Sequence, residues 1–148
     1  MTPPENRWFL VAMIAVSPPI SLGMLLVLRR THVPDVLRAM AEVFGESATA
    51  LASTSAAVTA LGTLAAAPLY HALYRRSVAR LKNPDDPRAK RSAALTALYV
   101  STSVPQLPAL FAIILLTVGA DLRPAMISVV LATVGAVLVG MASKSALP

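Results

Sequence analysis

The sequence contains no cysteine, and only 14% of its 148 residues are charged. The absence of thiols excludes disulfide bonds, thiolate metal ligands, cysteine nucleophiles and thiol lipidation. Soluble domains carry charge on about a quarter of their residues, whereas 56% of this chain is hydrophobic. The composition therefore predicts a membrane protein.

The hydrophobic residues are concentrated in four long runs. Arg123, at the start of the last run, is the one Asp, Glu, Lys or Arg found in them. A helix of about 20 apolar residues crosses the hydrocarbon core of a bilayer, and the remaining polar segments are too short to fold alone, since domains begin near about 50 residues. We therefore expect one all-α integral-membrane domain over residues 1–148, with four transmembrane helices arranged as two hairpins. The expected spans cover residues 8–28, 48–74, 93–118 and 122–141.

The orientation follows from the distribution of basic residues. Nine Lys and Arg lie on the side of the two termini and the loop at residues 75–92, against four on the other side. The excess marks the cytoplasmic side, so we expect a multi-pass protein with both termini in the cytoplasm. Ten arginines against three lysines favour a bacterial cytoplasmic (inner) membrane. Tyr70, His71 and Tyr74 precede the basic loop and fit an interfacial aromatic belt.

The loop at residues 75–92 is the main electrostatic feature. Cations beside a membrane gain about 1 kcal/mol each near anionic lipid, so we expect the bilayer's anionic headgroups as a partner. Topology and headgroup attraction account for these charges without a protein partner. No aromatic residue lies between Arg75 and Arg91, and we expect no nucleic-acid partner. The candidate headgroup residues are Arg75, Arg76, Arg80, Lys82, Arg88, Lys90 and Arg91.

The segment after the first span has helical periodicity. Its apolar residues recur on one side of a helix and its charged residues largely on the other. Pro34 suits the first turn and Gly45 the end of such a helix. We therefore predict a short amphipathic helix at about residues 34–45 on the outer membrane surface. It serves either as a connector or as a docking surface. The apolar residues are Val36, Leu37, Met40, Val43 and Phe44.

The second span is rich in small residues. Of the 20 residues from 48 to 67, 16 are Ala, Gly, Ser or Thr. Small side chains let helix backbones approach closely in a membrane, so this helix is predicted to be central. The same face serves either intramolecular packing or an oligomer interface. The candidate packing residues are Ser55, Thr59, Gly62 and Thr63.

Proline pairs interrupt the first and third spans near their middles. Each proline lacks an N–H and frees the carbonyl four residues earlier, at Ile14, Ala15, Ser101 and Val104. Interrupted helices at matching positions of two halves indicate a binding site at the membrane midplane. Kinks repaired by nearby polar side chains are the alternative. The candidate midplane residues are Ser17, Pro18, Pro19, Ser101, Thr102, Pro105, Gln106 and Pro108.

Residues 104–111 have the sequence VPQLPALF and are followed by an apolar run and a turn at Gly119. This part of the third span resembles the second helix of rotor-ring c-type subunits of ATP synthases, and c-like four-helix bacterial membrane proteins. In that family a glutamate beside a small-residue stretch carries the ion. Gln106 stands nearest to that position and cannot exchange a proton. The resemblance therefore implies a helical hairpin without ion translocation.

Catalytic patterns are missing. His32 and His71 are predicted on opposite sides of the membrane, and no HExxH, GxSxG or phosphate-binding glycine motif is present. We expect no enzyme activity, no metal and no cofactor. Ionisable residues inside the membrane mark pumps and transporters, and the spans have none at mid-depth. The sequence favours a structural or accessory subunit of a membrane assembly or homo-oligomer over a small transporter or channel component using the proline-broken helices.

Overall fold

The computed structural model describes residues 3–31, 35–81, 83 and 85–145. These residues form helices and connecting turns, without a strand, so the predicted all-helical class is confirmed. Four helices are long and apolar enough to cross a membrane. The elements are α1 (Pro3–Thr31), α2 (Asp35–Val78), α3 (Pro87–Thr117), α4 (Leu122–Ala142) and the short 3-10 helix η1 (Ser143–Ser145).

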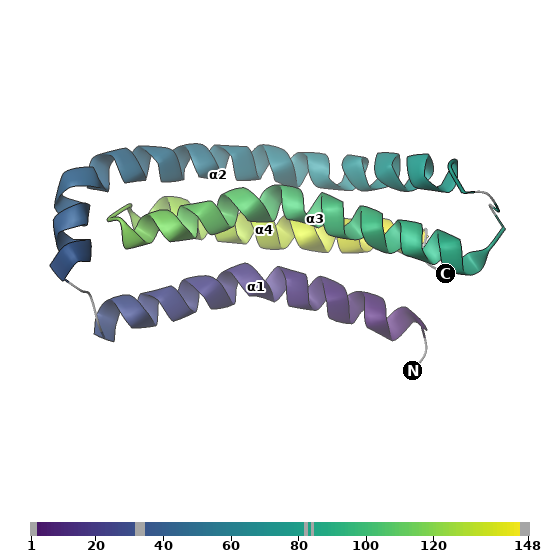
Figure 1. The fold of residues 1–148 in the computed structure, drawn as a ribbon, viewed down its shortest axis with the longest axis horizontal. Helices are drawn as coiled ribbons and strands as arrows, with labels where there is room; N and C mark the ends of the chain where they lie inside the picture. The colour runs from purple at the N-terminus through teal and green to yellow at the C-terminus, as the bar shows by residue number, and fades with distance from the viewer. Residues whose placement is uncertain (1–2, 32–34, 82, 84, 146–148) are drawn as a thin grey trace.

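The centre of the bundle is the α3 and α4 pair, with α1 on one side and α2 on the other (Figure 1). The prediction of two packed hairpins is not confirmed, because α3 and α4 pack together whereas α1 and α2 are separated by them. Helix α2, predicted to be central, packs closely against both α3 and α4 and lies on the side of this pair opposite to α1 (Figure 1). Small residues line the buried face of α4 as well, so close approach is not restricted to α2. They are Ala125, Ser128, Ala132, Gly135, Ala136 and Gly140.

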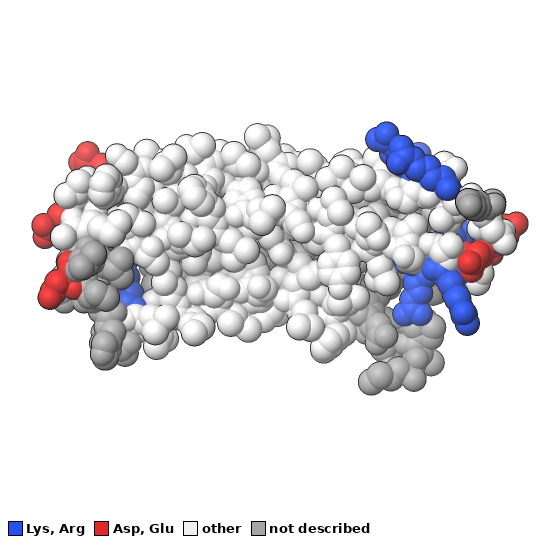
Figure 2. All heavy atoms as spheres, viewed as in Figure 1, with Lys and Arg blue, Asp and Glu red and all other residues white. Residues whose placement is uncertain are grey.

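The charged residues gather at the two ends of the bundle, and its middle shows none in the view of Figure 2. Helix α1 begins and α4 ends at the same end as the α2–α3 connection (Figure 1). The α3–α4 turn lies at the opposite end. This charge-free middle is the pattern expected of a body surrounded by hydrocarbon.

Residues 35–45, the crossing segment, form the first part of α2 and no separate helix. The start of α2 runs across the end of the bundle and then turns to follow α3 and α4 (Figure 1). The chain has to cross there because α1 and α2 lie on opposite sides of the pair. A helix of this length spans about 16 Å, which matches two interhelical spacings of about 8–10 Å each.

Tyr70 belongs to the core and not to an interfacial belt. Its side chain is 0% exposed, within a cluster that includes Ala66 and Leu98, and its ring stacks on Tyr74 at 6.2 Å. Tyr70 follows Ala66 by four residues, so both lie on the inward face of α2. His71, one residue later, is exposed. The belt prediction is therefore wrong for Tyr70.

Candidate functional site

The carbonyls freed by Pro18 and Pro19 accept hydrogen bonds from neighbouring helices. Gln106 of α3 donates through Nε2 to the Ile14 carbonyl at 2.9 Å. The single Oγ1–H of Thr133 in α4 is shared between the Ala15 carbonyl at 3.2 Å and the Val129 carbonyl of its own helix at 2.9 Å. Helix α1 is continuous through the prolines, and each of its two freed carbonyls is bonded by a side chain from one central helix.

The same region of α1 makes the apolar contact with the pair. Val11, Ala15, Pro18 and Leu22 are buried, and their spacing of four, three and four residues keeps them on one face. Ser17 and Pro19 are exposed on the other side. The carbonyls that the prolines free are bonded by Gln106 and Thr133 of the central pair. The polar and the apolar contacts of α1 with this pair are therefore made on the same face of the helix.

Pro105 is fully buried between α2 and α4. A Cβ added to Gly62 would lie 3.2 Å from the Pro105 Cα, and one added to Gly135 would lie 3.0 Å from the Pro105 Cγ. Two glycines thus leave the space that the proline ring and its backbone fill. Beside them, the Thr63 hydroxyl donates to the Leu131 carbonyl of α4 at 2.9 Å, which joins α2 directly to α4.

The four candidate packing residues of α2 are all buried. Ser55 is 7%, Thr59 0% and Thr63 5% exposed, and the Thr59 hydroxyl donates to the Ser55 carbonyl at 2.7 Å. Gly62 meets Pro105 as described above. Because this face is covered by α3 and α4, it is not available to a second copy or another protein in this structure.

The candidate midplane residues do not converge on one site. Ser101 and Thr102 are buried, but their hydroxyls donate to the α3 carbonyls of residues 97 and 98 at 2.7 and 2.8 Å. Gln106 and Pro108 are half-buried, while the candidates on the exposed side of α1 face away from them. The sequence prediction missed Thr133, whose signal was that it is one of only two hydroxyl residues in the last apolar span, the other being Ser128.

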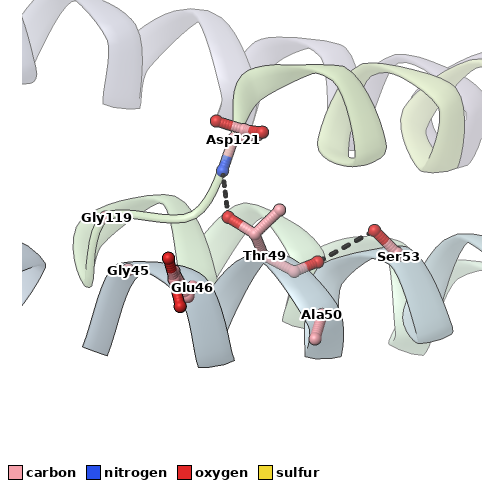
Figure 3. Close-up of a pocket in the computed structure, with 7 residues that line it drawn as sticks. All are labelled: Gly45, Glu46, Thr49, Ala50, Ser53, Gly119 and Asp121. Atoms are coloured by element: carbon pink, nitrogen blue, oxygen red, sulfur yellow. Dashed lines mark hydrogen bonds between the residues drawn. The ribbon is translucent and has the colours of Figure 1, made fainter.

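A shallow, open pocket of about 480 Å³ lies at the end of the bundle where α3 turns into α4 (Figure 3). The Asp121 N–H donates to the Thr49 hydroxyl at 3.0 Å, and the Ser53 hydroxyl donates to the Thr49 carbonyl at 2.9 Å. The bond from Asp121 fastens the turn to α2, whereas the bond from Ser53 lies within α2. Within the described ranges, no group of three His, Asp or Glu could hold a metal ion. The remaining lining residues are Gly45, Glu46, Ala50 and Gly119.

The candidate headgroup residues lie at the end with the α2–α3 connection. Lys82 is outside the described residues, Lys90 is half-buried, and the five arginines are exposed. Comparison with models of protein families, with curated proteins and with solved structures gives no match.

Proposed function

We propose that this protein is a non-enzymatic membrane protein that serves as a structural or accessory subunit of a larger membrane assembly or of a homo-oligomer. The supporting observation is that Gln106 and Thr133 are bonded to the carbonyls freed at the α1 break. A transporter with uncharged spans would need such carbonyls for its ligand. Here they fix the position of α1, and a rigid four-helix unit is suited to packing.

Breaking these bonds should cost little stability, and the cost should depend on the prolines. We expect Gln106→Leu to lower the free energy of unfolding by about 0.5–1.5 kcal/mol, the range of interhelical hydrogen bonds in membranes. Pro18→Ala restores an N–H that can reach the Ile14 carbonyl, so Gln106→Leu should cost much less in that background. Denaturant titration in detergent micelles measures the free energy of unfolding of wild type, Gln106→Leu, Pro18→Ala and the double variant.

The matched control exchanges the partners. Pro19→Ala restores an N–H that can donate to the Ala15 carbonyl, so Thr133→Val should lower the free energy of unfolding less in that background than in wild type. Pro18→Ala should reduce the cost of Thr133→Val by a smaller amount. If the cost of Gln106→Leu is the same with and without Pro18, bonding of the freed carbonyl does not contribute to stability and does not support a subunit role.

The same wild-type protein and Gln106→Leu variant also test the function directly. Cross-linking in native membranes should yield species heavier than the 15.5 kDa chain, and proteoliposomes of purified protein should show no more solute flux than protein-free vesicles. Recovery of the monomer alone would contradict a subunit role. Flux that is present in wild type and lost in Gln106→Leu would replace the proposal with a transporter or channel.

We further propose that the protein lies in a bacterial inner membrane, with both termini and the α2–α3 connection in the cytoplasm. The basic excess at that end supports this orientation. A cysteine at Asn83 should then react with a membrane-impermeant maleimide only after the membrane is opened, which is a clean measurement because the chain has no other cysteine. Reaction in intact cells would reverse the orientation.

The proposed orientation puts the crossing segment at the outer surface of the membrane. Val43 is 73% and Phe44 50% exposed, and apolar side chains at that height are stabilised in the interfacial layer. The crossing segment would then act as an interfacial helix while remaining continuous with the second span. Tryptophan introduced at Val43 should show blue-shifted emission in vesicles, and emission typical of water would contradict this placement.

A further inference from the structure

The whole net charge of the protein lies at one end of the bundle. The two termini and the α2–α3 connection hold nine Lys and Arg against three acids, Glu5, Asp85 and Asp86. The other end has four basic and four acidic residues, so the formal net charge of +6 comes entirely from the first end. An anionic partner is therefore attracted to one end only.

Five arginines beside the α2–α3 connection are exposed and are not ion-paired by the described part of the chain. Arg75, Arg76 and Arg80 are exposed at the end of α2, and Arg88 and Arg91 at the start of α3. Among the residues that the structure describes, none of them forms an ion pair. The Asp86 carboxylate instead accepts a hydrogen bond from the Arg88 backbone N–H at 2.9 Å as the cap of α3.

These cations adjoin the ends of the apolar runs of α2 and α3. Arg75 and Arg76 directly follow Tyr74, where the apolar run of α2 ends, and Arg91 stands two residues before Ala93, where that of α3 begins. At about 1.5 Å per helical residue, even Arg80 is within about 9 Å of the apolar part. The headgroup layer of one leaflet is about 5–8 Å thick, and long basic side chains bend toward it.

We propose that the basic end, formed by Arg75, Arg76, Arg80, Arg88, Lys90 and Arg91, is a binding site for the phosphates of anionic phospholipids. The guanidinium group donates two parallel hydrogen bonds to a phosphate, which suits a cluster with five arginines. An acidic protein would have to reach the headgroup layer, whereas lipid phosphates already occupy it. The site is independent of the proposed subunit role and of which leaflet the end faces.

The test measures which lipids the purified full-length protein retains. The protein is equilibrated in neutral detergent with equal amounts of phosphatidylglycerol and phosphatidylcholine and then weighed by native mass spectrometry. Wild type should retain phosphatidylglycerol preferentially. One cation is worth about fivefold in binding to an anionic surface, so the triple variant Arg75→Gln, Arg76→Gln, Arg80→Gln should lose about tenfold or more of this preference.

A control variant removes cations from the opposite end. Arg29 and Arg123 are also exposed, so Arg29→Gln with Arg123→Gln should leave the preference unchanged. Equal retention by the triple variant and wild type, or no preference in wild type, would overturn the site. Loss of the lipid to excess inorganic phosphate, with phosphate bound in its place, would assign the site to a soluble anion. Helical circular dichroism of each variant shows that its fold is intact.

Discussion

Gly119→Ala should lower the stability of the protein more than Gly62→Ala or Gly23→Ala does. Gly119 lies in the α3–α4 turn at φ +95°, and an added Cβ would meet the Ala41 Cβ at 2.6 Å and its Cα at 2.7 Å. Positive φ costs an alanine about 1–2 kcal/mol, and overpacking adds about 1–3 kcal/mol. We therefore expect unfolding in detergent to become easier by about 2–5 kcal/mol, measured by denaturant titration.

The matched control is Gly23→Ala. A Cβ at Gly23 would have nothing within 4 Å, and the residue lies inside α1. Alanine is favoured over glycine within a helix by about 1 kcal/mol, so this variant should be neutral or slightly more stable. Equal stability of the two variants would show that the crossing segment does not press against the α3–α4 turn.

The second large effect is expected for Gly62→Leu. The Cα and N of Pro105 lie 3.2 and 3.3 Å from the position of a Cβ on Gly62. These are backbone atoms and cannot turn aside, so a leucine side chain fits only if α2 moves away from α3. Separation would also strain the bond from Thr63 to the Leu131 carbonyl. We expect a loss of about 3 kcal/mol or more, seen as loss of the folded protein in size-exclusion chromatography.

Two further variants should lose less stability than Gly62→Leu. Gly62→Ala needs a displacement of only a few tenths of an ångström and should be intermediate. Leu51 is 51% exposed on the outer face of α2, and Leu51→Ile should behave as wild type. Tolerance of Gly62→Leu with a normal elution profile would contradict the close contact of α2 with α3.

The sequence by itself determined the class of this protein. Four apolar stretches of sufficient length dictate helices, because backbone groups in hydrocarbon must be bonded within their own segment. It also determined which carbonyls the prolines free, since a missing N–H always affects the residue four positions earlier. Ile14 and Ala15 were identified in this way, and both bonds made to them in the structure come from other helices.

Only the tertiary structure decided what those carbonyls do and which helices are central. All four spans are apolar, and α2 and α4 are both rich in small residues, so neither periodicity nor composition predicts which pair packs at the middle. The partner of Ile14 lies 92 residues away and that of Ala15 lies 118 residues away. Contacts over such distances depend on the order in which helices pack. That order also makes the chain cross the bundle end, which is why residues 35–45 join α2.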